Sequence, residues 1–344
     1  MIRSLTTMFV VAFVLICVRA EAQAPHVYHV TGAVAYTHDP SIIREGKTWY
    51  VFATGKAPEG GQLPIRCSTN LIDWKFCGQV FPGIPAWIRK RSPGTEALWA
   101  PDISHEDHEY RLYYAYSLFG KNTSGIALAV NRTLDSASPE YRWVNKGLVL
   151  QSTVKDDYNA IDPNFVRDRK GRSWLVFGSF WSGIKLRRLN KEGLVSKEHT
   201  KLYSLARRAE PAHPAPAPKG LPPNWEAIEA PFIVWHGGYY YLFTSWDLCC
   251  RGIHSTYRTM VGRSRAITGP YVDKTGKPLL DGGGSELLVG NSRWLGPGGE
   301  SVWMGRHGKD LIIFHAYSAK TGRPSMQLST LVWVDGWPEA ALEK

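Results

Sequence analysis

The sequence predicts an all-β protein, and specifically a five-bladed β-propeller. Five stretches share one plan, a short acidic or proline-containing signature followed by an apolar run, a turn and a second apolar run; they begin at His38, Ala100, Ile161, Glu229 and Gly299. Their aligned positions lie 61, 62, 68 and 69 residues apart and are Pro40, Pro101, Pro163, Pro231 and Glu300. A sheet unit repeated at this spacing is typical of a propeller, whose inner strands all begin near one axis.

Strand signals dominate the rest of the chain. The segments are short, rich in β-branched or aromatic residues and bounded by turn residues; they cover residues 48–54, 111–117, 126–130, 173–179, 183–189, 239–245 and 310–318. Outside the N-terminus, no segment shows helical periodicity over ten residues. We therefore expect one all-β domain over residues 25–344.

Residues 1–24 have the features of a secretory signal peptide. Arg3 provides a positive start, and the apolar stretch 8–18 is too short to span a bilayer comfortably. Small residues at alternate positions, Ala20, Ala22 and Ala24, offer cleavage sites. We expect a secreted or periplasmic protein with no membrane attachment beyond this peptide.

The composition suits a large globular core and sugar recognition. The chain has 344 residues, 44% of them hydrophobic, with 14 tryptophans and 16 tyrosines. Most of these rings pack strands, but flat aromatic rings also stack on the apolar faces of sugars. The net charge of +11 is dispersed; it favours polyanions such as pectin or a simply solvated surface, and no nucleic-acid-binding motif accompanies it. We expect a monomer with no nucleic-acid partner.

Four cysteines remain once Cys17 leaves with the signal peptide. Cys67 and Cys77 flank a hairpin-like stretch and are either bridged after export or buried as thiols. Cys249 and Cys250 are adjacent, so their α-carbons lie about 3.8 Å apart, below the usual disulfide range. A vicinal disulfide and two free thiols are equally open for this pair.

Three carboxylates stand at the starts of repeats one, three and four: Asp39, Asp162 and Glu229. Asp39 and Asp162 directly precede a proline, which favours an extended backbone and a carboxylate held at a strand edge. Asp-Pro is also a common strand-entry turn, but its recurrence in a five-fold frame predicts that the three carboxylates meet near the axis. Because they would repel one another, at least one should have a raised pKa. An ionised base beside a protonated acid is what hydrolysis of a glycosidic bond requires.

Two further acidic residues depart from this pattern. Asp102 follows its proline and Glu300 replaces one. We interpret both as structural or pocket-lining.

The chain resembles glycoside hydrolase family 43, and within it the arabinan endo-1,5-α-L-arabinosidases. The resemblance covers nearly all of the mature chain. The matching segments include HDPSII (38–43), LWAPDIS (98–104), NAIDPN (159–164), GSFWSGIKL (178–186), IEAP (228–231), YYYLFTSWDLCCRG (239–252) and WVDGWP (333–338). The resemblance implies a five-bladed propeller and an inverting mechanism.

The same resemblance divides the roles of the three carboxylates. Asp39 matches the general base that activates water, and Glu229 matches the general acid that protonates the leaving oxygen. Asp162 matches the third carboxylate, which tunes the pKa of the acid and orients it. An inverting pair is expected about 6.5–9.5 Å apart and a retaining pair about 5–5.5 Å apart.

Substrate-binding residues follow from the family's sugar-binding stretches. The matching positions are Trp99, Phe119, Asn159, Ile161, Ser179 and Trp181. Each of them fits a core position equally well. His38, next to the base, is either a sugar ligand or a satisfied polar residue at a strand start.

A metal site is the point at which the chain departs from the family. Many members carry Gly-Pro-Gly-His before the last blade, and that histidine approaches a metal near the axis. Here residues 296–299 read Gly-Pro-Gly-Gly, so this ligand is absent, although His315 is available on a neighbouring inner strand. One histidine with waters would suit Ca²⁺ better than zinc.

We therefore expect an inverting hydrolase that cleaves internal α-1,5-L-arabinofuranosidic bonds of arabinan, a pectin side-chain polysaccharide. The alternatives are an exo-acting arabinofuranosidase or β-xylosidase on the same scaffold, a non-catalytic sugar-binding propeller, and a retaining fructan-type hydrolase. Exo action needs a groove blocked at one end. The proline-rich loop 208–224 and the segment 82–97 are the candidates for such a block.

Overall fold

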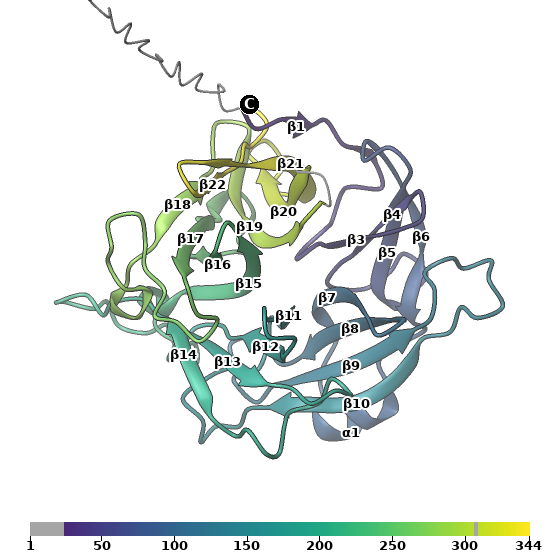
Figure 1. Ribbon diagram of the computed structural model, residues 1–344, viewed down its shortest axis with the longest axis horizontal. Helices are drawn as coiled ribbons and strands as arrows, with labels where there is room; N and C mark the ends of the chain where they lie inside the picture. Colours follow the sequence, from purple (N-terminus) through teal and green to yellow (C-terminus); the bar gives the residue numbers. More distant parts are fainter. Residues whose placement is uncertain (1–23, 306–308) are drawn as a thin grey trace, which may run out of the picture.

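The structure is a computed structural model that describes residues 24–305 and 309–344, and its strands form five sheets around one axis (Figure 1). The predicted five-bladed propeller is confirmed. We call each sheet a blade and number the blades by the chain order of their innermost strands. The expected signal peptide covers residues 1–24, and residues 1–23 of it lie outside the described residues.

Each blade is an antiparallel meander that runs outward from the axis. Blade 1 contains β3 (Ser41–Glu45), β4 (Thr48–Phe52), β5 (Gln62–Ser68) and β6 (Asp73–Phe81). Blade 2 contains β7 (Trp99–Glu106), β8 (Glu109–Tyr116), β9 (Gly125–Asn131) and β10 (Val144–Gln151). Blade 3 contains β11 (Asn164–Arg167), β12 (Ser173–Phe177), β13 (Ile184–Arg188) and β14 (Leu202–Ala206).

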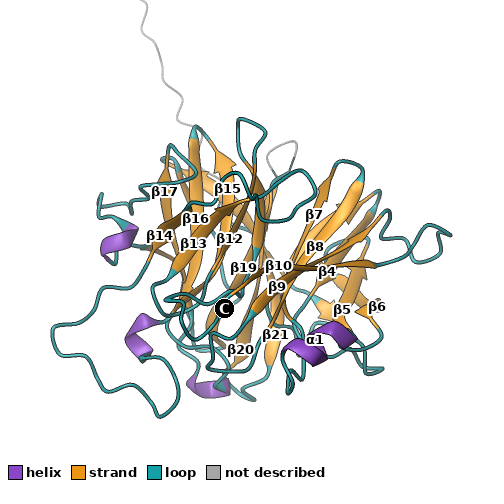
Figure 2. Cartoon of the chain, turned by 90° about the horizontal axis from the view of Figure 1, so that it is seen from below, coloured by secondary structure: helices purple, strands orange, loops and turns teal. Residues whose placement is uncertain are grey.

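The last two blades follow the same plan. Blade 4 contains β15 (Ile228–His236), β16 (Tyr239–Trp246), β17 (Arg258–Ser264) and β18 (Ser285–Leu288). Blade 5 contains β19 (Trp294–Trp303), β20 (Asp310–Ser318) and β21 (Pro324–Val334), and the short β22 (Trp337–Glu339) pairs with β21. The helices are short and lie in connections: α1 (Ala86–Arg91), η1 (Asn224–Glu226), η2 (Gly252–His254) and η3 (Leu279–Asp281) (Figure 2).

The core consists of five apolar layers, one between each pair of neighbouring blades. Strand β8 shows how the sequence produces them, because successive side chains of a strand point to opposite faces. Leu112 and Tyr114 pack towards blade 1, whereas Tyr113 packs towards Phe165 of blade 3. Both faces of a blade are therefore buried, which explains why these strands are apolar almost throughout.

The ring is closed by the first described residues of the chain, a point that the sequence did not reveal. Strand β1 (Val27–Tyr28) adds to the outer edge of blade 5 by pairing with β21, and β2 (Thr31–Gly32) then pairs in parallel with β6 of blade 1. Tyr28 is buried in the apolar layer between these two blades. The first described residues thus link the last blade to the first.

Left-handed kinks at the axis were not expected. The residue before each aligned position has a positive φ: Asp39 (+47°), Ala100 (+43°), Asp162 (+55°), Ala230 (+50°) and Gly299 (+60°). The expectation of an extended backbone at Asp39 and Asp162 is therefore wrong. Only Gly299 adopts this conformation without a steric penalty, so the other four kinks need support from their surroundings.

Side chains of the preceding blade supply that support at four of the five kinks. The backbone N–H of Ala100 donates to Thr54 Oγ1 (2.7 Å), and that of Gly299 donates to Ser245 Oγ (2.8 Å). In the same way, Ala230 donates to Asp162 Oδ2 (3.1 Å), and Asp39 donates to His315 Nδ1 (3.2 Å). Four of the five blades thereby fix the kink in the inner strand of the next blade.

A second set of hydrogen bonds joins neighbouring inner strands, at residues that follow the kinks. A polar side chain near the start of one inner strand accepts a backbone N–H from a neighbouring inner strand, in the pairs Ser41 with Ile103, Asp102 with Phe165, Asn164 with Ile233, and Ser301 with Ile42. Asp102 is thus a structural residue, as the sequence analysis proposed.

The structure pairs the four cysteines of the mature chain as two disulfides. Cys67 on β5 is joined to Cys77 on β6, and Cys249 is joined to its neighbour Cys250. Among residues 24–305 and 309–344, no helix is long and apolar enough to cross a membrane.

Removal of the ring-closing segment should destabilise the whole propeller. A mature chain that starts at Ala33 lacks β1, β2 and the buried Tyr28, and we expect its Tm to fall by about 5 °C or more relative to a chain that starts at Pro25. Differential scanning calorimetry of the two chains measures the shift. Equal Tm values would show that the N-terminal strands do not hold the ring together.

Candidate active site

One pocket opens at the axis and collects every site residue proposed from the sequence except His315. It encloses about 1360 Å³ of empty space and is lined by the three carboxylates Asp39, Asp162 and Glu229. All seven proposed substrate-binding residues also line it: His38, Trp99, Phe119, Asn159, Ile161, Ser179 and Trp181. These residues come from blades 1 to 4, so only the closed ring brings them together.

Asp39 lies at the kink that precedes β3, with its side chain 29% exposed to the pocket. Its Oδ2 accepts a hydrogen bond from the Thr54 hydroxyl (2.6 Å), and its own N–H is held by His315. Burial raises the pKa of Asp39, while His38 and the Thr54 hydroxyl oppose that shift. No side chain or N–H of residues 24–305 and 309–344 donates a hydrogen bond to Oδ1, which can therefore accept a proton from water.

Glu229 lies at the start of β15 and accepts two hydroxyl hydrogen bonds. Ser179 Oγ donates to Oε2 (2.6 Å), and the Tyr257 hydroxyl donates to Oε1. Burial raises the pKa of Glu229 above its ordinary value, and the two hydroxyls partly offset that rise. A carboxyl group with a raised pKa suits proton donation.

Asp162 lies at the kink that precedes β11 and reaches towards the acid rather than towards open solvent. Its Oδ2 accepts the N–H of Ala230, the residue after Glu229, at 3.1 Å. Burial, followed by repulsion from Glu229 and Asp39, raises the pKa of Asp162 well above its ordinary value. Asp162 therefore fixes the backbone that carries Glu229 and is electrostatically linked to both other carboxylates.

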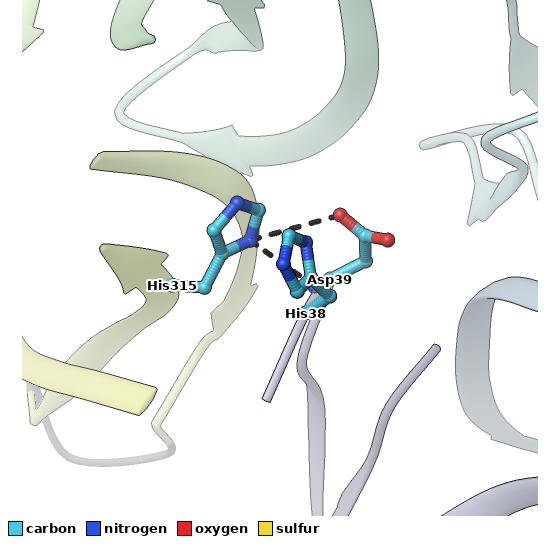
Figure 3. A group of neighbouring side chains, drawn as sticks. All are labelled: His38, Asp39 and His315. Carbon is cyan, nitrogen blue, oxygen red and sulfur yellow. Dashed lines mark hydrogen bonds and ion pairs between the residues drawn. The ribbon is translucent and has the colours of Figure 1, made fainter. Parts of the chain in front are cut away.

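His38 and His315 lie beside the base (Figure 3). Their rings are 4.3 Å apart between centroids. His315 is fully buried, and burial holds its pKa well below the ordinary value, so the ring is neutral. Its Nδ1 accepts the Asp39 N–H, and its Nε2 lies 3.3 Å from the Tyr317 hydroxyl.

The cluster of His38, Asp39 and His315 is the candidate metal centre. One potential ligand atom from each residue lies within 4.8 Å of the others. Ca²⁺ takes about six to eight oxygen ligands, whereas this cluster offers a single carboxylate. Both ring nitrogens of His315 already have protein partners. These side chains do not fit Ca²⁺ as a set of direct ligands, and no catalytic step below depends on a metal.

Gly299 occupies the position where the family pattern has histidine. A Cβ at this position would lie 2.5 Å from Asp39 Oδ1 and 2.8 Å from His315 Nδ1, in a backbone with φ +60°. Any side chain here would therefore displace the base or its histidine partner. The glycine is required by the close approach of blade 5 to Asp39.

Asp102 and Glu300 lie with Asp39 and Asp162 around a small cavity on the axis. Burial raises the pKa of Asp102 to about 7 and that of Glu300 to about 7. Ser245 Oγ donates to Glu300 Oε2 at 2.8 Å. The sequence interpretation of this pair as structural or pocket-lining agrees with these positions.

The rim of the pocket includes part of the proline-rich loop 208–224. Leu221, Pro222 and Asn224 line the pocket, whereas none of residues 82–97, all of them described, does so. The Lys121 ammonium donates to the Gly220 carbonyl (3.3 Å), which ties the loop to the turn that carries Phe119. Phe119 is 74% exposed, as expected of a rim residue.

Sequence reasoning missed Thr54 and Ser245, and it expected Ser179 to bind sugar rather than to hold a carboxylate. Thr54, Ser179 and Ser245 each end the second apolar run of a repeat, and each donates to a carboxylate: Asp39, Glu229 and Glu300 respectively. That recurrence was a usable signal. Tyr257 and Tyr317 had no comparable signal, because their partners come from other parts of the ring.

Comparison with known proteins adds three similarities. Residues 34–338 match the sequence model of glycosyl hydrolases family 43. The chain is 43% identical to the extracellular exo-α-(1→5)-L-arabinofuranosidase ArbA of Cellvibrio japonicus, over 88% of this chain and 85% of that protein. It is 42% identical to the extracellular endo-α-(1→5)-L-arabinanase 1 of Bacillus subtilis, over 88% of this chain and 86% of that protein.

A solved structure has a similar fold and a similar level of sequence identity. The Cellvibrio cellulosa α-L-arabinanase complexed with arabinohexaose superposes with a TM-score of 0.81 at 40% identity, covering 90% of this chain and 96% of that one.

Tyr257→Phe should shift the pH dependence of catalysis. The Tyr257 hydroxyl lowers the pKa of Glu229, so its loss should raise that pKa and move the alkaline limb of the pH–rate profile to higher pH. We expect kcat to fall about tenfold because the acid is less well oriented. Tyr271→Phe, which removes a buried hydroxyl outside the pocket, is the control. An alkaline limb that stays in place or moves to lower pH would contradict this electrostatic role.

Gly299→Ala should abolish most activity through contact with Asp39 rather than through backbone strain. Gly237→Ala is the matched control, because Gly237 has a similar φ (+53°) but no atom within 4 Å of a built Cβ. We expect kcat to fall about a hundredfold for Gly299→Ala and to be unchanged for Gly237→Ala. Steady-state kinetics with melting curves separates the effects, and equal losses of kcat would refute the contact argument.

Proposed function

The chain belongs to glycosyl hydrolases family 43, and from this premise we propose that it is an inverting glycosidase cleaving internal α-1,5-L-arabinofuranosidic bonds of arabinan. The observation that carries the proposal is the convergence of three carboxylates from blades 1, 3 and 4 on one pocket. Two relatives named for α-(1→5)-linked arabinan activity, each over 40% identical, support the substrate class.

The two hydrogen-bonding environments support the proposed division of proton duties. Asp39 lines the pocket and has one oxygen held by the Thr54 hydroxyl, which suits a base that takes a proton from water. Glu229 is held by Ser179 and Tyr257 and has a raised pKa, which suits an acid that protonates the leaving oxygen. Water then attacks the anomeric carbon on the face opposite the departing oxygen, and the configuration inverts.

The remaining assignments are also proposals. The seven pocket-lining residues named above would contact the sugar, with Trp99 and Trp181 offering flat rings to its apolar face. Export is supported by the word "extracellular" in the names of both relatives. A monomeric state stays a prediction. Binding of Ca²⁺ also stays a prediction, and it would need water molecules as most of its ligands, because the side chains of the cluster do not fit it directly.

Exo action on the same polysaccharide is the second candidate. A relative of this activity is 43% identical, and loop 208–224 is tied across part of the pocket rim through Gly220 and Lys121. Endo and exo action use the same carboxylates. They differ only in the way the polysaccharide enters the pocket.

Loss of either carboxylate should abolish hydrolysis of linear arabinan. We expect Asp39→Ala and Glu229→Ala to lower kcat by about 10²–10⁴-fold, whereas Glu192→Ala, an exposed carboxylate outside the pocket, leaves kcat unchanged. On a nitrophenyl arabino-oligosaccharide, whose leaving group needs no proton, Glu229→Ala should recover activity but Asp39→Ala should not. Recovery by Asp39→Ala instead would reverse the two roles.

Product sizing distinguishes endo from exo action. Early digests of linear arabinan should contain oligosaccharides of mixed length, because internal bonds are cleaved at random along the polymer. Chromatography of products at a few per cent conversion tests this. A single product of fixed length from the first time point would establish exo action.

A further inference from the structure

The Cys249–Cys250 disulfide lies on the wall of the pocket, in the connection between β16 and β17. This connection lines the pocket with four consecutive residues, Leu248, Cys249, Cys250 and Arg251. Cys250 is exposed and Cys249 is half-buried, so solvent and solutes reach the sulfur atoms. Neither cysteine has a part in the proton transfers described above.

The backbone of this pair is connected to the catalytic base by a series of hydrogen bonds. The N–H of Cys250 donates to the Tyr317 hydroxyl oxygen at 2.8 Å. That oxygen lies 3.3 Å from His315 Nε2, and His315 Nδ1 accepts the N–H of Asp39 at 3.2 Å. Because Nδ1 is the acceptor in a neutral ring, Nε2 carries the proton and donates it to Tyr317.

The hydroxyl oxygen of Tyr317 therefore accepts from two donors, one on each side. Tyr317 is 1% exposed and His315 is fully buried, so both side chains are held in place by their surroundings. His315 in turn holds the N–H of Asp39, whose φ of +47° is costly for a residue other than glycine. The position of the base thus depends on a hydrogen bond that begins at Cys250.

The disulfide encloses the peptide unit that supplies this hydrogen bond. The N–H of Cys250 belongs to the peptide bond between Cys249 and Cys250. The disulfide between the two sulfur atoms closes a small ring that contains this peptide bond. Within the ring, the direction of the N–H is restricted. Cys250 itself has a φ of +65°, a conformation that an open, exposed loop would readily leave.

We propose that the Cys249–Cys250 disulfide is a positioning element for the catalytic base and acts through Tyr317 and His315. This rests on the proposed function, in which Asp39 is the base. Opening the ring frees the Cys250 N–H to turn away, and His315 then holds Asp39 less well. The expected effect is a loss of kcat with a smaller change in KM, because the base and not the sugar contacts is disturbed.

The test uses the mature chain carrying Cys67→Ser and Cys77→Ser, so that Cys249–Cys250 is the one disulfide left. Tris(carboxyethyl)phosphine reduces it to two thiols and becomes the phosphine oxide, whose oxygen comes from water. Thiol titration should find no free thiol before reduction and two after it. We expect reduction to lower kcat about tenfold.

A double-mutant cycle separates positioning from other roles. In a chain that also carries Tyr317→Phe, the hydroxyl that transmits the effect is gone. We expect Tyr317→Phe alone to lower kcat about tenfold, and reduction in that background to change kcat by less than about twofold. Melting curves of all four states report whether the fold persists.

Three outcomes would overturn the proposal. They are two free thiols before reduction, an unchanged kcat after reduction, and an equal loss on reduction with and without the Tyr317 hydroxyl. The last outcome would mean that the sulfur atoms act on the sugar or on the fold directly. Activity surviving in Asp39→Ala would instead refute the proposed function, so the two failures are distinguishable.

Discussion

The left-handed kinks at the axis are the constraint on which the rest of the molecule depends. Each inner strand has a residue with positive φ just before it or within it, and four of these residues donate their N–H to a side chain of the preceding blade. Kinks at residues other than glycine persist only where the surroundings hold them. Here the surroundings are the neighbouring blades, so the catalytic geometry exists only when the ring is closed.

This arrangement explains why the same side chains serve both fold and site. Asp162 holds the backbone next to Glu229, and Thr54 binds both Asp39 and the kink of blade 2. Burial at the axis raises the pKa of all three carboxylates, and hydroxyl donors reduce that effect at Asp39 and Glu229. The division of proton duties thus arises from unequal hydrogen bonding among buried acids.

The sequence predicted the five blades and the convergence of Asp39, Asp162 and Glu229, because a repeat places equivalent strand starts around one axis. It could not predict how the ring closes, since Val27 and Thr31 pair with strands from opposite ends of the chain. Both Asp39 and Asp162 were wrongly expected to be extended. At Asp39 the local proline preference is overridden with the help of a hydrogen bond to His315 of blade 5, whereas the described residues supply no such bond to the N–H of Asp162. Tyr257 and Tyr317 were missed for a similar reason: their partners are set by blade packing and not by sequence spacing.

The central claim is that a base and an acid act on opposite sides of one glycosidic bond, with water between the base and the sugar. Proton NMR of the first-formed reducing end during cleavage of an α-1,5-linked arabino-oligosaccharide tests it most directly. We expect the β-anomer to appear first and then to equilibrate. First appearance of the α-anomer would show retention and would contradict the assignment of Asp39 as a base that activates water.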